Sequence, residues 1–238
     1  MTAAVDPELP LLARRDDALV LAKPAGWLVH PSAWAGPPER TLVDLVREAH
    51  GPGYHPVHRL DRQTSGVVVF ARGPDAVRAW QAALDAPAAD KRYLALVRGQ
   101  VLAATEVDHP IRDTGGVSRD ARSYVEPLVR RPEPWRSSLV RVRIYTGRTH
   151  QVRRHLAHLS HPVIGDANHG KGPLNRAFRD GLGLARMALH ARSLAVVAPD
   201  ASAPTTFVAP VPDDLAAVLD TLWADWRAAL DAAEAATG

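Results

Sequence analysis

The sequence predicts an α+β fold, and three observations support this prediction. Short apolar runs rich in β-branched residues and amphipathic helical patterns both occur along the chain. They follow one another without the regular strand–helix alternation of a doubly wound parallel sheet. The chain has 238 residues, 46% of them hydrophobic and 23% charged, as is ordinary for a folded protein with a sizeable core. We therefore expect one domain over residues 18–238, after an N-terminal lead-in over residues 1–17.

The first half of the chain mixes strands and helices. Residues 18–22 form an apolar run that predicts a buried strand, ended by a Lys-Pro pair. Thr41 is placed to cap a short helix whose apolar residues share one face. Residues 67–71 predict a second strand, and residues 74–84 have apolar side chains at helical spacing. The alternation over residues 93–97 predicts a third strand.

The second half continues the mixture. Residues 123–129, 138–145 and 189–197 predict strands, whereas residues 148–159 have the period of an amphipathic helix. Residues 213–235 predict one long acidic helix, capped by an aspartate at its start. Loops are expected over residues 31–38, 108–120 and 165–183.

The charges are spread unevenly. Residues 212–238 hold six acids and one arginine, a net charge of −5, and since the whole chain carries +3 the remainder carries +8. Within that remainder, residues 134–165 contain six arginines, four histidines and no acid. A basic stripe of this kind is the electrostatic footprint expected of a polyphosphate partner. The alternative is a drift of composition toward alanine and arginine along the chain.

Composition also excludes several classes of protein. The chain has no cysteine, which excludes disulfide scaffolds, thiolate metal sites and cysteine nucleophiles. No apolar run reaches the ~18 residues of a membrane span, so no membrane partner is expected. The first residues carry acids and no basic segment, unlike a secretion signal. We therefore expect a cytoplasmic protein.

The most informative stretch is His58-Arg59-Leu60-Asp61-Arg62, continued by Gln63-Thr64-Ser65-Gly66. It places one carboxylate among cationic side chains directly before an apolar strand. Such an acid can be catalytic, because perturbed titratable groups gather in clefts. It can equally be a loop aspartate that caps a turn with the following hydroxyl residues. The residues alone leave both readings open.

Four ordered blocks resemble one enzyme family. Residues 58–66 resemble the H-R-L-D-x-x-T-S-G signature of the RluA-type pseudouridine synthases, with every fixed position present. The other blocks resemble K-P-x-G-x-x-V-H-P at 23–31, K-x-Y-x-A-x-V-x-G at 91–99 and G-R-T-H-Q-[IV]-R at 147–153. Ser160 and His169 depart from the glycine and tyrosine that the family often has there. The run over residues 153–159 and later stretches are most similar to the TruC branch, which modifies uridine 65 of tRNA.

This resemblance implies a fold and a reaction. The fold would be a mixed, mainly antiparallel sheet with flanking helices and a central catalytic cleft, without a separate N-terminal RNA-binding domain. The reaction would detach uracil N1 from C1′ of a uridine in structured RNA and rejoin the base through C5, with no metal or other cofactor. The implied partner is tRNA, with ribosomal RNA or both RNAs as the alternative, and the implied protein is a monomer.

The resemblance also implies roles for individual residues. Asp61 matches the catalytic aspartate, and attack on C1′ or C6 or removal of the 2′ proton all remain open for it. Arg148 matches the arginine that pairs with that aspartate. Tyr93 matches the tyrosine that stacks on the base, and a role for it in proton transfer from C5 is also open. Arg59 matches the residue that fills the gap left by the flipped base. The candidates for phosphate or sugar contacts are Arg62, His150, Arg153 and Arg154. Lys23 and His30 are expected to support the cleft.

Two other classes of function compete with this interpretation. A metal hydrolase would use His155, His158 and His161, but residues 134–165 offer no acid as ligand or base. A structural role for His155 beside the apolar stripe is the better explanation. A catalytically silent RNA-binding module would use the basic stripe equally well. It would have no use for Asp61, because a carboxylate among phosphate contacts weakens binding.

Overall fold

The computed structural model describes residues 9–31, 40–170 and 172–236, and most of the expected loop at 31–38 lies outside them. The strands are β1 (Leu11–Arg14), β2 (Ala18–Lys23), β3 (Tyr54–Pro56), β4 (Ser65–Arg72), β5 (Asp90–Arg98), β6 (Thr105–Asp108), β7 (Ile111–Arg112), β8 (Ser118–Arg119), β9 (Arg122–Arg131), β10 (Ser137–Ile144), β11 (Leu189–Val197) and β12 (Pro204–Val208). The helices are α1 (Leu42–His50), α2 (Gly73–Asp85), α3 (Gln151–His158), α4 (Gly172–Leu182), α5 (Asp213–Leu222) and α6 (Trp226–Ala235).

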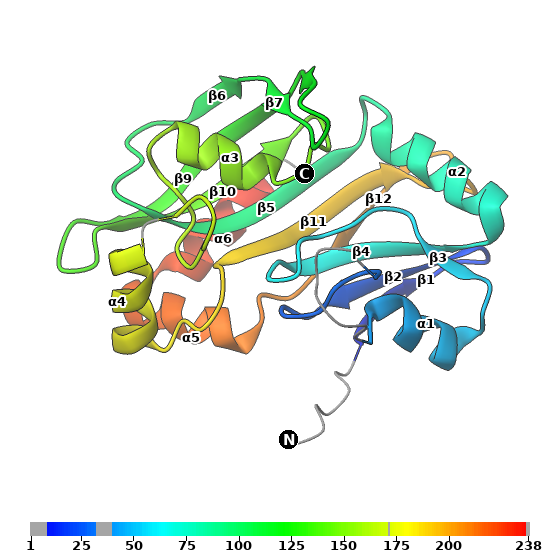
Figure 1. Cartoon of the computed structure of the whole chain (residues 1–238), viewed down its shortest axis with the longest axis horizontal. Helices are drawn as coiled ribbons and strands as arrows, with labels where there is room; N and C mark the ends of the chain where they lie inside the picture. The colour runs from blue at the N-terminus through cyan, green and yellow to red at the C-terminus, as the bar shows by residue number, and fades with distance from the viewer. Residues whose placement is uncertain (1–8, 32–39, 171, 237–238) are drawn as a thin grey trace.

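One large twisted sheet organises the molecule (Figure 1). Its strand order is β1-β2-β4-β11-β5-β10-β9-β6, with β12 paired to β11 and β3 paired to β4. Among the described pairs only β4 and β11 run parallel. The expected α+β fold with a mainly antiparallel sheet is therefore confirmed.

Helices cover both faces of the sheet. In Figure 1, α3 lies in front of the sheet and α6 behind it. Behind, α5 and α6 bury their leucines and tryptophans against Leu94, Leu96 and Leu139. In front, α3 packs on β5 and β10 in one cluster and α1 packs on β2 and β4 in another. Tyr93 packs against both of these front clusters, so it lies between the α3 cluster and the α1 cluster.

The middle of the sheet brings three strands into register. Ala191 of β11 pairs with Gly66 of β4 on one side and with Tyr93 of β5 on the other. Gly66 has φ +119°, and a Cβ there would lie 2.1 Å from the Ala191 carbonyl oxygen. The close approach requires glycine. This close approach of β4 to β11 places the loop that precedes β4 beside the ring of Tyr93.

Local sequence signals explain several elements. Thr41 and Asp44 form a capping box at the start of α1, as the expected cap predicts. Strands β2, β4, β5, β9 and β11 each contain the corresponding predicted run, and α2 contains the predicted helix. Strand β10 contains the run predicted over residues 138–145 except its last residue. Among the described helices, none is long and apolar enough to cross a bilayer.

Five expectations about local structure are wrong. The lead-in contains β1, which pairs with β2, and the expected loop at 108–120 contains the β7–β8 hairpin, whose turn Asp113 caps. Residues 172–182 form α4 rather than loop, because Phe178 is buried against α5 and its neighbours. The helix expected from 148 begins at Gln151, since His150 has the left-handed φ of 56°.

The fifth error concerns the C-terminal helix, which is two helices and has Pro212 rather than an aspartate at its N-cap. The chain is extended at Trp223, and α6 begins at Trp226. This break lets both tryptophans enter the same cluster, with 8% and 2% of their surface exposed. Tertiary burial of two large rings therefore overrides the continuous helical pattern.

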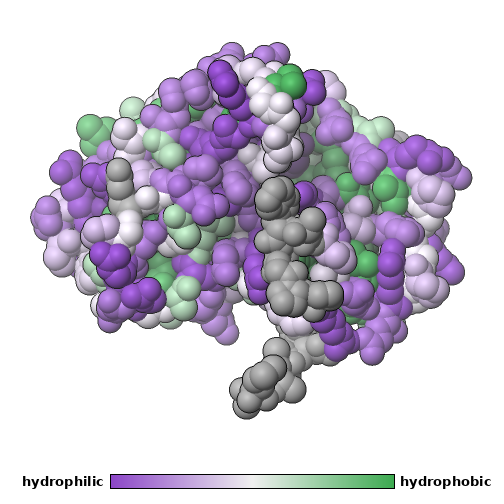
Figure 2. Space-filling model, in the orientation of Figure 1, coloured by the Kyte–Doolittle hydropathy of each residue, from purple (hydrophilic) through white to green (hydrophobic). Residues whose placement is uncertain are grey.

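Figure 2 shows a mostly hydrophilic front surface, with hydrophobic residues gathered in the region between α1 and α2.

We predict that Gly66→Ala lowers the free energy of unfolding by about 3 kcal/mol or more, because both the backbone conformation and the β11 contact oppose a Cβ. Urea denaturation measures this change. Gly147→Ala is the control, since a Cβ there meets nothing within 4 Å. Its stability should stay within about 0.5 kcal/mol of the original chain. Equal stability of the two variants would contradict this account of the sheet centre.

Candidate active site

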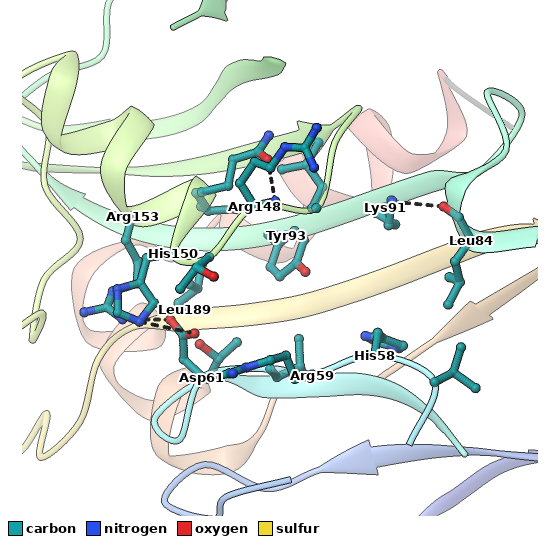
Figure 3. A pocket seen from close by; sticks show the side chains of 18 of the residues that line it. His58, Arg59, Asp61, Leu84, Lys91, Tyr93, Arg148, His150, Arg153 and Leu189 are labelled. Atoms are coloured by element: carbon teal, nitrogen blue, oxygen red, sulfur yellow. Dashed lines mark hydrogen bonds and ion pairs between the residues drawn. The ribbon is translucent and has the colours of Figure 1, made fainter. Parts of the chain in front are cut away.

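A cavity of about 390 Å³ opens at the middle of the sheet. Its walls come from the segment before β4, from α2, from β5 and from residues 147–153, with Leu189 of β11 at its base. Figure 3 shows Asp61 at one end, Tyr93 in the middle, and His58 and Lys91 at the other end. The volume falls in the range of roughly 300–1,000 Å³ that is typical of ligand pockets.

Asp61 lies on a loop that several hydrogen bonds hold in place. Its carbonyl oxygen accepts the backbone N–H of Thr64 at 3.0 Å, which closes a turn before β4. The next residue, Arg62, accepts the Gly26 amide at 2.8 Å through its carbonyl and donates Nε to the Gly26 carbonyl at 3.0 Å. The buried Lys23 ammonium also donates to the Arg62 carbonyl, at 3.1 Å. The carboxylate is therefore fixed at the cavity, with 21% of its side chain exposed.

Lys23 supports this loop from below, as expected from the sequence. It is 1% exposed, and its second acceptor is the Pro24 carbonyl at 2.8 Å. Burial lowers the pKa of Lys23 to about 7, and the neighbouring Arg186 lowers it further while Asp61 opposes that change. The side chain is thus a structural donor to two carbonyls rather than a group that faces the cavity.

The arginine that pairs with Asp61 is Arg153, and the expected pairing by Arg148 is wrong. Arg153 Nη1 donates to Asp61 Oδ2 at 2.8 Å. Its other face donates to both oxygens of Asp166, from Nε at 2.7 Å and from Nη2 at 2.9 Å. Arg153 is 7% exposed, so it is a buried bridge between two carboxylates. The expected phosphate contact by Arg153 is therefore wrong as well.

Arg148 lies instead at the exposed rim. Its Nε donates to the Asp120 carbonyl at 2.9 Å, and its backbone N–H donates to Gln151 Oε1 at 3.0 Å. The physical reason is the late start of α3. Arg148 precedes the helix and turns outward, whereas Arg153 lies in its first turn and points inward to Asp61 (Figure 3).

Tyr93 faces Asp61 from strand β5. Burial raises the pKa of the Tyr93 phenol well above its usual range, and the Asp61 charge raises it further. The ring is therefore a neutral, flat, partly apolar surface with one O–H donor. It suits stacking against a planar base better than it suits acceptance of a proton at neutral pH.

The remaining basic candidates divide between the rim and the interior. Arg59 and Arg62 are exposed, and Arg59 lines the cavity beside Asp61. Arg154 is half-buried and donates Nη1 to the Arg112 carbonyl at 2.7 Å, so it holds the β7–β8 hairpin against α3. His150 is half-buried with its Nε2 3.7 Å from Asp61 Oδ1.

The far end of the cavity holds groups that sequence reasoning missed. His58 accepts the Val69 amide through Nε2 at 3.2 Å, and burial lowers the pKa of His58 to about 4, with the Lys91 charge lowering it further. Lys91 donates to the Leu84 carbonyl at 3.0 Å. Both residues belong to the blocks quoted above, so their motif positions were the available signal.

Asp166 was also missed. It is 1% exposed, and burial alone would raise its pKa, but hydrogen bonds from Arg153 and from the His169 and Asn168 amides hold the pKa of Asp166 below its usual value. The sequence carried one signal for it: Asp166 is the first acid after the acid-free stripe.

The buried histidine of α3 has a polar partner at each ring nitrogen. His155 is fully buried, with Nδ1 2.9 Å from Ser123 Oγ and Nε2 3.0 Å from the His109 carbonyl oxygen. This confirms the expected structural role of His155. Across the described part of the chain, no group of three or more His, Cys, Asp or Glu side chains is arranged to hold a metal ion.

Comparisons with known proteins agree on one family. The RNA pseudouridylate synthase family model matches residues 17–158. The tRNA pseudouridine synthase C of Haemophilus ducreyi is 34% identical over 206 residues, which cover 79% of this chain and 84% of that protein. The ribosomal large subunit pseudouridine synthase D of Xanthomonas campestris pv. campestris is 37% identical over 243 residues, covering 94% of this chain and 73% of that protein.

Solved structures agree with the sequence relatives. The human protein RNA pseudouridylate synthase domain containing 4 superposes with a TM-score of 0.71 at 25% identity, covering 90% of this chain and 92% of that one. The human protein RNA pseudouridylate synthase domain containing 1 superposes with a TM-score of 0.70 at 26% identity, covering 96% of this chain and 98% of that one.

Proposed function

This chain belongs to the RNA pseudouridylate synthase family and is an isomerase of the RluA type, and from this premise we propose that its substrate is tRNA and that Asp61 is its catalytic carboxylate. The observation that carries the proposal is the Asp61–Arg153 pair, which faces the Tyr93 ring across a cavity of about 390 Å³. Arginines stand at the rim of that cavity.

The reaction makes simple demands on the site. The bond between N1 and C1′ breaks, the base turns, C5 bonds to C1′, C5 loses a proton and N1 gains one. No electrons are gained or lost overall. A single carboxylate, kept ionised and aimed at the nucleoside, is sufficient to start the process, whether by attack on C1′ or C6 or by removal of the 2′ proton.

Arg153 aims the carboxylate. Its Nη1 donates to Asp61 Oδ2 at 2.8 Å, and its second partner, Asp166, fixes the direction of its donors. We assign to Arg153 the role of pairing with Asp61 and to Arg148 a contact with RNA at the exposed rim of the cavity. The raised pKa of Tyr93 favours stacking on the base over removal of the C5 proton.

The target base of a folded RNA must leave its helix to reach this cavity, which costs a few kcal/mol. Arg59 is exposed beside Asp61, and we propose that it enters the gap that the base leaves. Arg148 is exposed at the cavity rim and Arg62 is exposed in the loop that carries Asp61, and both are proposed to contact phosphates. Arg154 is half-buried and contributes to RNA binding by holding the β7–β8 hairpin at the cleft edge.

Uridine 65 of tRNA is the proposed target, and ribosomal RNA is the second candidate. The tRNA enzyme of Haemophilus ducreyi and the run over residues 153–159 favour the first, and the Xanthomonas campestris relative favours the second. We further propose that the protein acts in the cytoplasm as a monomer with one catalytic domain over residues 18–238, within which every residue that lines the cavity falls.

The first test identifies the RNA. Pseudouridines are mapped in total RNA from cells with and without the gene, and we expect a site at position 65 of tRNA to disappear. A loss confined to ribosomal RNA would contradict the tRNA assignment and leave the activity intact. Purified protein and tRNA transcribed in vitro then show whether the same uridine is converted directly.

The second test addresses Asp61. Asp61→Asn keeps the size and shape of the side chain but removes its charge and nucleophile, so pseudouridine formation should fall at least about 10³-fold. RNA affinity should change less than about threefold, because the arginines at the rim remain. Release of tritium from C5-labelled RNA measures conversion, and filter binding measures affinity. Conversion at the original rate would overturn the assignment.

The third test separates the two arginines. Arg153→Met removes the partner of Asp61 and should lower kcat by about 100-fold or more, since charge placement at the reacting centre is lost. Arg148→Ala, the matched variant at the rim, should raise KM for RNA by about 3- to 10-fold with kcat nearly unchanged. A larger fall of kcat in Arg148→Ala than in Arg153→Met would restore the pairing expected from sequence.

A further inference from the structure

His150 lies next to Asp61 and His169 lies next to His150. The proposed reaction gives His169 no role. The ring of His150 lies next to the carboxylate, with Nε2 3.7 Å from Asp61 Oδ1. The ring of His169 lies behind it, with Nε2 3.5 Å from His150 Nδ1. The two rings meet edge to face, with centroids 5.7 Å apart and planes at 77°. His169 is thus connected to Asp61 through His150.

The same residues are linked by a second route, which closes a ring. Asp61 accepts from Arg153, and Arg153 donates to Asp166. Asp166 Oδ1 in turn accepts the backbone N–H of His169 at 3.0 Å. The contacts through Arg153 and Asp166 therefore hold the backbone of His169, whereas the contacts through His150 involve the His169 side chain. Both routes end on the carboxylate of Asp61.

The loop that carries His169 is firmly held. The Gly165 amide donates to Asn175 Oδ1 at 2.9 Å, and Asn175 Nδ2 donates to the Asp166 carbonyl at 2.8 Å. A Cβ at Gly170 would lie 2.2 Å from the Asp166 carbonyl oxygen, so the chain turns back on itself directly after His169. On the other side, His150 has the left-handed φ of 56°, which aims its ring at Asp61. Both rings are held in place by the backbone that carries them.

The surroundings keep both imidazoles neutral near pH 7. His150 faces Asp61, Arg153, His169 and Asp166, and burial lowers its pKa, with Asp61 opposing. His169 faces Asp166, Arg153, Arg154 and Asp61, and burial lowers its pKa too, with Asp166 opposing. A neutral imidazole has one N–H and one lone pair, so the position of each proton matters.

Only one arrangement of these protons satisfies every neighbour. If His150 carried its proton on Nδ1, the Nε2 lone pair would face the Asp61 carboxylate, and two acceptors would repel. If the proton is on Nε2, it points toward Asp61, and Nδ1 is then free to accept Nε2–H from His169. At 3.7 Å the first contact is longer than a hydrogen bond, so it acts through charge and dipole.

We propose that His169 is a positioning residue, which donates its Nε2–H to His150 Nδ1 and thereby fixes the tautomer of His150 that presents Nε2–H to Asp61. The carboxylate then accepts a hydrogen bond from Arg153 on Oδ2, and the positive end of the His150 N–H dipole faces Oδ1 at 3.7 Å. The catalytic consequence rests on the proposed role of Asp61, but the tautomer itself does not.

The decisive measurement is therefore made without RNA. Protein labelled with ¹⁵N-histidine is studied by NMR near pH 7, where the ring nitrogen shifts identify the tautomer, and a His150→Gln variant identifies the His150 signals. We expect His150 as the Nε2–H tautomer in the original chain. Detection of the Nδ1–H tautomer would overturn the proposal, whatever the activity of the protein.

Three variants extend the test to function. His169→Phe keeps a flat ring without a donor, and His169→Tyr restores one donor at the ring end. His158→Phe is the control, because His158 is an exposed residue of α3 whose ring stacks on His109, with centroids 4.0 Å apart. We expect His169→Phe to lose the fixed tautomer of His150 and to lower kcat about 10-fold, with KM for RNA changed less than about twofold. His169→Tyr and His158→Phe should stay within about twofold of the original kcat.

The pH profile provides a readout that a purely structural role would not move. Without the neighbouring imidazole, which opposes a cation at His150, the pKa of His150 rises. Protonated His150 would pair more tightly with Asp61, so the acidic limb of the kcat profile should move to higher pH in His169→Phe. In His169→Tyr the limb should move back, because the phenol O–H occupies the Nδ1 lone pair that protonation of His150 requires. An unchanged limb and unchanged kcat in a folded His169→Phe would overturn the catalytic part. If no variant or original chain made pseudouridine, the proposed function would fail while the NMR result still decided the tautomer.

Discussion

A single buried guanidinium connects the parts of this molecule that matter for its chemistry. Arg153 lies between the carboxylates of Asp61 and Asp166, at 2.7–2.9 Å from each. Removing three charged groups from water is costly, and the arrangement is stable only when the charges are paired with good geometry. Removal of the arginine would leave two carboxylates without their common counter-ion. Its position therefore determines where Asp61 can point.

Each partner of this bridge comes from a different part of the chain. Asp61 precedes β4, Arg153 is in the first turn of α3, and Asp166 begins the loop that leads to α4. The register at the sheet centre makes the meeting possible, since Ala191 pairs with both Gly66 and Tyr93. The parallel contact of β4 with β11 sets the distance between the Asp61 loop and the Tyr93 ring. The strand register and the ion pairs of Arg153 thus together position Asp61 and Tyr93 at the same cavity.

The basic residues between 134 and 165 lie in two different environments in the folded chain. Some are exposed at the rim, where Arg148 stands, and others are buried in ion pairs. On the other face of the sheet, Arg141 pairs with Glu126 across neighbouring strands and contributes nothing to the cavity rim. Buried charges of this kind stabilise structure or orient a reactive group, whereas exposed ones attract phosphate. The charge count of a segment does not separate these uses.

Local sequence patterns were sufficient to predict the α+β class, most strands and the Thr41 cap, and the motifs indicated Asp61 and Tyr93 as candidate site residues, which line one cavity. Motif and periodicity are local properties, so they can be recognised without the fold. These local patterns did not determine which arginine of residues 147–153 reaches Asp61, because both share one motif and the direction of each depends on where α3 starts. The left-handed His150 moves that start to Gln151, turns Arg148 outward and turns Arg153 inward. The break at Trp223, the β1 pairing and the role of Asp166 were likewise decided by tertiary contacts, since burial and distant partners govern them.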